Sequence, residues 1–516
     1  MNIYIIETFF VYILCIIKYI DIKNIYQGCF KESFLVERGV LMIKLMIISG
    51  IVLLICITSS KVFYKFGVPL LLIFILLGML FGSEGLVGIY YDNFELTNQL
   101  CSLALVFIIF YGGFGTNWTM ASPVVLPSIL MSSFGVIITA GLTGAFCYFV
   151  MKTTLLEGLL IGSVIASTDA ASVFAVLRAQ KLNLKGSLAS LLELESGSND
   201  PIAYMITIVI LTMMKSSGDL SIGAVLLLVG KQVIFGLFVG FVIAKSTVLL
   251  LRYAKFEIEG FYTIFIIAVA ILSYSVTEYI GGNGYLSAYV AGIIIGNSRI
   301  PLKKTVFHFF DGISWIMQIA LFFMLGLLSF PSKFIYVKTI AISVALFLIF
   351  IARPIATFLI LAPFKFTTKE KLFISWVGLR GAASVVFAII ASTYGVSIDN
   401  DIFHIVFFIA LFSVAIQGTL IPKVANLLGL VDEEKDSALK TFTDYSGEIN
   451  TDLLEISIKD DDKWSNKSIM DANIPEEILI VMIKRNDKII IPKGSTILMG
   501  GDILVVSGNN IKDMIS

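Results

Sequence analysis

The run Glu195-Ser196-Gly197-Ser198-Asn199-Asp200-Pro201 places two carboxylates in a stretch that otherwise reads as membrane helix. An ionised side chain at bilayer depth costs about 2.5–3.5 kcal/mol on insertion scales, so such residues usually face an ion path. Helical spacing puts Ser196 and Asp200 on one face, and Glu195 and Asn199 on an adjacent one. The pattern therefore predicts an ion path, the alternative being a loop acid at the end of a span.

A second polar segment, residues 162–172, has Thr168 and Asp169 at its centre. Its small polar residues permit close packing and an unwound turn, whose freed carbonyl groups could ligate a cation.

Two arginines also lie within apolar stretches. Arg380 occupies the glycine-broken run 378–384, and Arg353 precedes a proline inside the span 334–361. Buried arginines need counter-charges, and Glu195 and Asp169 are the acids available at that depth. We expect these four residues to serve mainly in structural charge pairing, which leaves Asp200 as the acid for exchange chemistry.

The composition indicates that membrane-spanning helices must position these residues. The chain has 516 residues, of which 58% are hydrophobic and 14% charged, which indicates an integral membrane protein. A formal net charge of zero gives no basic footprint for nucleic acid. The five cysteines form no CxxC pair, so neither a disulfide framework nor a metal knuckle is indicated.

Apolar runs suited to a hydrocarbon core of about 30 Å predict thirteen spans after Met42. They are residues 45–58, 66–82, 100–116, 124–150, 155–177, 188–214, 222–251, 261–276, 285–296, 313–328, 334–361, 373–391 and 402–430. Several are short or broken by glycine, as expected where helices interrupt around a site.

Basic residues in the connections predict the orientation. If the first span starts outside, the inner loops contain Lys61, Lys65, Arg178, Lys181, Lys185, Arg252, Lys255, Arg299, Lys303, Lys304, Lys365, Lys369 and Lys371. The opposite loops contain only Lys152, Lys215, Lys333 and Lys338. This asymmetry places the C-terminus in the cytoplasm, in agreement with an odd number of spans.

The two ends of the chain differ from its centre. Residues 1–41 are interpreted either as an extra helix or as sequence preceding a translation start at Met42. A charged linker, 431–450, follows the last span. Residues 451–516 predict a small soluble α+β domain with strands at 453–458, 478–484, 488–491 and 503–506.

The membrane part resembles the NhaP-type bacterial cation/proton antiporters of the monovalent cation:proton antiporter superfamily. The resemblance covers about residues 45–430 and rests on four motifs in order: Ser167-Thr168-Asp169-Ala170-Ala171, residues 195–201, Gly284-Tyr285-Leu286-Ser287-Ala288-Tyr289-Val290-Ala291-Gly292, and Gly378-Leu379-Arg380-Gly381-Ala382. It implies inverted repeats, a dimerisation domain, a core domain and two discontinuous helices that cross at mid-membrane. A homodimer in the bacterial cytoplasmic membrane is expected.

The resemblance also implies roles for single residues. Asp200 would alternately carry a proton or a monovalent cation (K⁺ or Na⁺), with Ser196 and the Thr168 carbonyl helping to bind the cation and Asn199 steadying the site. Glu195 would pair with Arg353. Asp169 and Arg380 would neutralise the half-helix dipoles at the crossing.

One motif departs from the family. Many relatives have an acid on the third span within Phe-Asp-Gly-Gly, whereas this chain reads Phe110-Tyr111-Gly112-Gly113, with no acid in 100–116. The number of cation ligands and the cation preference are therefore left open.

The tail resembles the C-terminal subdomain of regulators of potassium conductance (TrkA-C-like), through residues 480–485, 491–494 and 501–506. This resemblance favours K⁺ as substrate and regulation by a small ligand, in some relatives a cyclic dinucleotide; no other cofactor is expected. The competing interpretation is a ligand-gated cation channel, but the chain lacks a Thr-Val-Gly-Tyr-Gly filter. An intramembrane enzyme is not indicated either, because the chain lacks the Gly-x-Ser-x-Gly and His-Glu-x-x-His motifs.

Overall fold

The computed structural model describes residues 34–63, 69–180, 182–216, 221–253, 256–431, 452–458, 462, 464–472, 474–475, 478–485 and 488–508. The chain divides into two compact units, Met1–Phe442 and Thr443–Ser516. Most of the N-terminal extension and nearly all of the predicted linker 431–450 lie outside the described residues. Residues 34–41 belong to the first described helix.

The first unit is helical, and its elements follow the apolar runs of the sequence. They are α2 (Phe34–Phe63), α3 (Leu70–Phe81), α4 (Phe94–Gly115), α5 (Trp118–Ala121), η2 (Ser122–Val124), α6 (Val125–Leu130), η3 (Met131–Gly135), α7 (Val136–Met151), α8 (Leu155–Val164), α9 (Ala170–Ala179), α10 (Leu188–Lys215), α11 (Ile222–Tyr253), α12 (Gly260–Tyr279), α13 (Gly284–Gly296), α14 (Lys303–Leu328), η4 (Pro331–Lys333), α15 (Phe334–Phe347), η5 (Leu348–Ala352), α16 (Arg353–Ile360), α17 (Thr368–Trp376), α18 (Ala382–Thr393), α19 (Ile402–Phe412), η6 (Ser413–Gly418) and α20 (Thr419–Leu428).

Each of the thirteen predicted stretches contains helix in this list, and a polytopic helical membrane fold is confirmed. Among the described residues, seven helices are long and apolar enough to cross a membrane by themselves. Six further apolar helices are shorter, among them α8, α9, α13 and α18. The predicted number of thirteen spans therefore depends on combining short helices across breaks, as in α8 with α9.

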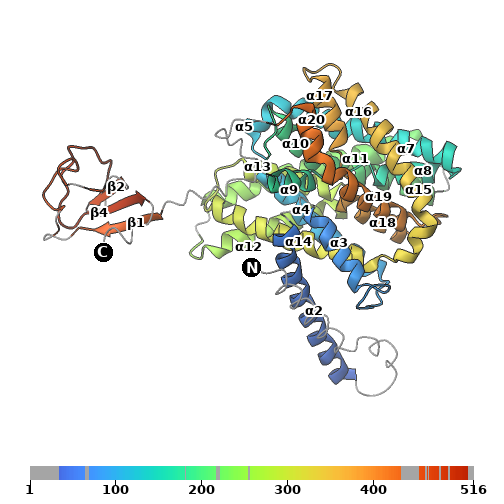
Figure 1. Cartoon of the computed structure of the whole chain (residues 1–516), viewed down its shortest axis with the longest axis horizontal. Coiled ribbons are helices and arrows are strands. Elements are labelled where there is room, and N and C mark those ends of the chain that lie inside the picture. Colours follow the sequence, from blue (N-terminus) through green and yellow to red (C-terminus); the bar gives the residue numbers. More distant parts are fainter. Residues whose placement is uncertain are drawn as a thin grey trace. The chain divides into compact units, whose positions relative to one another are not determined.

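The helices pack in two groups. We call α3, α4 and α11–α14 the scaffold group, in which α13 packs against α4, α11 and α12 (Figure 1). We call α6–α10 and α15–α20 the core group, with contacts such as α7 on α8 and α15 on α19. Glycines allow the backbones to touch: a Cβ on Gly78 of α3 would lie 2.2 Å from the Phe323 carbonyl oxygen of α14.

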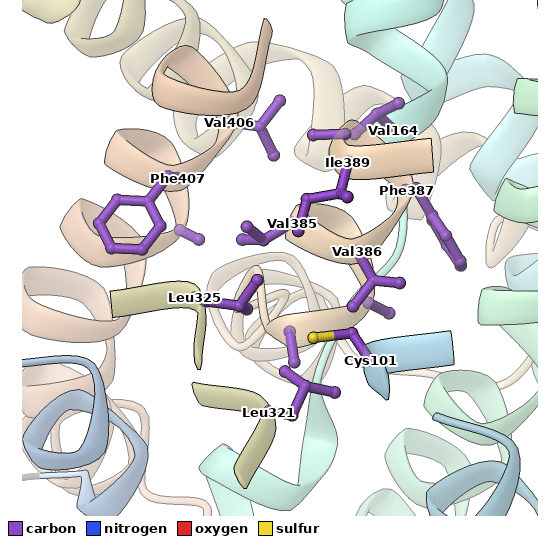
Figure 2. Packing of buried hydrophobic residues seen from close by; sticks show 14 of the residues in the cluster. Cys101, Val164, Leu321, Leu325, Val385, Val386, Phe387, Ile389, Val406 and Phe407 are labelled. Atoms are coloured by element: carbon purple, nitrogen blue, oxygen red, sulfur yellow. The ribbon is translucent and has the colours of Figure 1, made fainter. Parts of the chain in front are cut away.

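The two groups share one apolar core around α18. Figure 2 shows Val385, Val386, Phe387 and Ile389 of α18 among side chains of α4, α8, α14 and α19. All four are buried, and helix α18 has no charged residue in its sequence. Its burial on several sides explains why a helix of only 12 residues is stable there.

The second unit has a four-stranded antiparallel sheet in the order β1-β4-β2-β3. The strands are β1 (Asp452–Ser457), β2 (Leu479–Arg485), β3 (Lys488–Ile490) and β4 (Ile503–Gly508), close to the four predicted runs. The expected helical part is absent from the described residues of 452–508, where 464–472 forms turns and a bridge. Its residues are too polar and too rich in turn formers to continue a helix.

Candidate functional site

Two broken helices meet in the core group. The α8–α9 stretch is non-helical at residues 165–169, and the α17–α18 stretch at 377–381. The two breaks touch through a hydrogen bond of 2.9 Å from the Asp169 amide to the Leu379 carbonyl. Four helix ends, whose backbone groups need partners from outside their own helices, therefore meet at one place inside the membrane part.

Two charged side chains form hydrogen bonds with backbone groups at these helix ends. Asp169 caps α9, accepting from the Ser172 amide at 3.3 Å and from the Ser172 hydroxyl at 2.6 Å. Arg380 is fully buried, and its Nη1 donates to the carbonyls of Ala166 and Ser167, just past the end of α8, at 2.7 and 2.8 Å. The negative Asp169 thus lies at the positive N-terminal end of α9, and the positive Arg380 lies near the negative C-terminal end of α8.

Asp200 lies on α10 against the first break. Its carboxylate accepts a hydrogen bond from the Ser167 hydroxyl. One residue earlier, Asn199 is buried and its Nδ2 donates to Thr168 Oγ1 at 2.5 Å. Because Asn199 Oδ1 has no partner among the described residues, an oxygen stays available beside Asp200.

Ser196 connects α10 to the same break. Its hydroxyl donates to the Thr168 carbonyl at 2.8 Å and accepts from the Ala170 amide at 2.9 Å. The structure therefore brings Ser196, Thr168, Asn199 and Asp200 together. The direct partner of Asp200 is Ser167, however, which sequence reasoning did not select.

Glu195 and Arg353 form an ion pair between α10 and α16. Arg353 Nη2 lies 2.6 Å from Glu195 Oε1, and the two side chains are 3% and 2% exposed. Gly378 makes room for the pair, since a Cβ there would lie 2.8 Å from Arg353 Nε. Neither side chain is hydrogen-bonded to Asp200 in the part of the chain that the structure describes, so this pair braces the helices around the site.

A proline shapes the site-bearing turn. Pro201 lies inside α10 and has no N–H to offer to the Gly197 carbonyl four residues earlier. Helix α10 continues through this position, so a carbonyl oxygen lacks its usual partner in the turn that contains Asp200. Such oxygens are suitable ligands for a hard monovalent cation.

The third predicted span, which has no acid of its own, obtains one from another helix. Tyr111 of α4 donates its hydroxyl to Asp311 Oδ1 of α14 at 2.8 Å. A separation of 200 residues between the two side chains hid this pair from sequence reasoning. Among the described residues, no group of three or more His, Cys, Asp or Glu side chains could hold a metal ion.

Comparison with known proteins identifies the family to which a chain with this site belongs. The family described as sodium/hydrogen exchanger, transmembrane, matches residues 50–427, which include every residue of the site. The chain belongs to the sodium/hydrogen exchanger family. The TrkA-C domain matches residues 453–510.

Relatives agree with this assignment. The chain is 34% identical to the K⁺/H⁺ antiporter NhaP of Alkalimonas amylolytica, over 89% of this chain and 80% of the relative. It is 31% identical to the K⁺/H⁺ antiporter NhaP2 of Shewanella sp. (strain ANA-3), over 90% and 80%. The family consists of cation/proton antiporters, so the chain is a transporter and not an enzyme.

A solved structure confirms the fold. The sodium proton antiporter MjNhaP1 from Methanocaldococcus jannaschii superposes with a TM-score of 0.66 at 23% identity, over 75% of this chain and 99% of that one. The membrane unit of this exchanger-family chain thus has the architecture of an antiporter, with the crossed breaks of α8–α9 and α17–α18 at its centre.

Proposed function

We propose that this chain exchanges K⁺ for H⁺ across the bacterial cytoplasmic membrane, with Na⁺ as the alternative cation. The two named relatives are K⁺/H⁺ antiporters, which supports K⁺. The observation that carries the mechanism is the position of Asp200, a carboxylate beside the unwound segment with Ser167 as its hydrogen-bond partner. Proton and cation would compete for this one group.

The mechanism follows from the arrangement of charges. Glu195, Arg353, Asp169 and Arg380 are occupied with one another or with helix ends, so Asp200 is the acid available to load and unload. Ser196, Thr168 and Asn199 would complete the cation site with oxygen atoms. One cation would then cross for each proton, through a rocking of the core group against the scaffold group, with no net charge moved.

The remaining features are proposed with it. The protein would be a homodimer, as the family resemblance implies. Its C-terminus would lie in the cytoplasm, which is the orientation that the basic residues of the loops favour. The TrkA-C domain would regulate exchange by binding a small ligand, such as a cyclic dinucleotide. No nucleic-acid partner and no other cofactor is proposed.

The test uses proteoliposomes that hold a pH gradient. Addition of K⁺ or Na⁺ should drive proton movement that ignores an imposed membrane potential, and the cation with the lower half-saturating concentration is the substrate. Asp200→Asn should abolish exchange while the protein stays folded in a thermal unfolding scan. Exchange by the Asp200→Asn protein would refute the assignment, and cation flux that follows the potential without a proton gradient would indicate a channel instead.

A further inference from the structure

Tyr289 of α13 has a deeply buried hydroxyl. The side chain is 4% exposed, and Oη has no hydrogen-bond partner among the described residues. Burying a hydroxyl without a partner is unfavourable, because the group loses its hydrogen bonds to water. Native proteins usually retain such a group where water or an ion completes it.

The ring of Tyr289 lies against the turn of α10 that contains the site. A Cβ on Gly197 would lie 2.8 Å from Tyr289 Cε2 and 2.9 Å from Oη, so only glycine fits there without a shift. Gly197 follows Ser196 and precedes Asp200 by three residues. The scaffold group therefore meets the core group at the site through this tyrosine.

Two other hydroxyl groups lie near the Tyr289 hydroxyl. The hydroxyls of Thr116 and Ser198 lie beside it, on the C-cap of α4 and on α10. Each gives its proton to its own helix: Thr116 Oγ1 donates to the Gly112 carbonyl at 2.9 Å and Ser198 Oγ to the Leu194 carbonyl at 2.5 Å. Both oxygens thus keep lone pairs but have no proton to offer.

The electrostatics of this place favour a cation. The carboxylates of Glu193 and Asp200 are both within electrostatic range of the Tyr289 hydroxyl. Neutral oxygens near negative charge are the environment in which a monovalent cation gives up hydration water. An anion would meet repulsion from both carboxylates.

We propose that the hydroxyl oxygens of Thr116, Ser198 and Tyr289 form a second binding site for the monovalent cation. It lies between α4, α10 and α13, on the side of Asp200 where α4 ends, which the loop charges assign to the cytoplasm. A cation rests here before it reaches Asp200. This inference rests on the proposed function, since it deepens the path of the same substrate.

The experiment measures the half-saturating K⁺ and Na⁺ concentrations of exchange in proteoliposomes with the full chain. Tyr289→Phe and Ser198→Ala should each raise the half-saturating concentration by about three- to tenfold, the loss expected for one ligand hydrogen-bonding group. The matched control is Tyr285→Phe, one turn earlier on α13. Its hydroxyl is also buried and has no hydrogen-bond partner in the described part of the chain. Its ring packs on Tyr204 and Tyr274, at 4.8 and 5.0 Å between ring centres, so Tyr285→Phe should behave as wild type.

A double variant, Tyr289→Phe with Ser198→Ala, separates one shared site from two independent effects. A shared site predicts a rise clearly smaller than the product of the single rises. Unchanged half-saturation in Tyr289→Phe, an equal rise in Tyr285→Phe, or a fully multiplicative double variant would overturn the proposal. If Tyr289→Phe does not fold, Ser198→Ala and Thr116→Val decide by the same criterion.

The proposed function fails separately from this inference. Absence of exchange in the wild type, or exchange by Asp200→Asn, would refute the function whatever the Tyr289 variants do. Normal exchange with wild-type cation affinity in Tyr289→Phe would refute the second site alone.

Discussion

At the scale of single residues, the membrane unit contains more buried charge than exchange requires. Glu195 and Arg353 are almost fully enclosed, and Arg380 has two guanidinium nitrogens without a partner among the described residues. Buried ion pairs gain little net stability, because desolvation offsets their attraction. Breaking one, however, leaves a lone charge inside the protein, which is far more costly.

The Glu195–Arg353 pair gives the first prediction. Arg353→Gln should lower the free energy of unfolding by about 3–5 kcal/mol because it leaves the Glu195 carboxylate buried and unpaired. The double variant Arg353→Gln with Glu195→Gln should recover a large part of that loss. Thermal unfolding of purified protein in detergent measures both. An Arg353→Gln protein as stable as wild type would show that the pair does not brace α10 against α16.

At the scale of elements, the crossing depends on a glycine. A Cβ on Gly381 would lie 2.4 Å from Asp169 Cβ and 2.6 Å from its Oδ2, so any side chain there pushes the two breaks apart. Helix α7 offers a contrast in Gly141, where a Cβ would meet nothing within 4 Å.

We therefore expect Gly381→Ala to abolish exchange, because Asp169 can no longer cap α9 while the Leu379 carbonyl stays bonded to the Asp169 amide. Gly141→Ala should exchange as wild type, and is the matched control. Proton movement in proteoliposomes, at equal protein incorporation, measures both. Full activity in Gly381→Ala would mean that the crossing adapts to the added methyl group.

The sequence predicted the elements better than their contacts. Apolar runs located the helices of the membrane unit, and alternation located the four strands of the tail to within about two residues. Contacts such as Ser167 with Asp200 and Tyr111 with Asp311 depend on how distant helices are rotated and shifted against one another. A pattern within one segment contains no such information, so motif positions indicated Asp200 but not its partner.

At the scale of the whole molecule, the two units differ in what stabilises them. The tail has a small sheet whose main polar anchor is the pair of Arg485 and Asp502, with Nε–Oδ1 at 2.6 Å and Nη2–Oδ2 at 2.7 Å. Asp502 Oδ2 also accepts from the Met499 amide at 2.8 Å. Burial by itself would raise the pKa of the Asp502 carboxyl, but the bonds from Arg485 and Met499 outweigh it and lower that pKa.

This lowered pKa gives a pH-dependent prediction. The stabilisation by Asp502 is fully present above the pKa of an unfolded aspartate, about 3.9, and is lost as the pH falls through the lower folded-state pKa. Calorimetry of the full chain should therefore show the transition of the tail weakening below about pH 4. Asp502→Asn should weaken that transition at neutral pH and reduce its acid sensitivity. Equal acid sensitivity in Asp502→Asn would assign the effect to other groups.

The cancellation of charge inside the core group has an electrical consequence. Glu195 and Arg353 sum to zero, as do Asp169 and Arg380, so the buried site formed by these four charges and Asp200 is neutral whenever Asp200 holds either cargo. The membrane field, worth about 2.3 kcal/mol per charge per 100 mV, then does no work on it. In an unloaded carrier, the ionised Asp200 carboxylate would instead have to move past the apolar side chains around α18. That barrier would prevent the unloaded protein from cycling, and so would suppress leak of either ion.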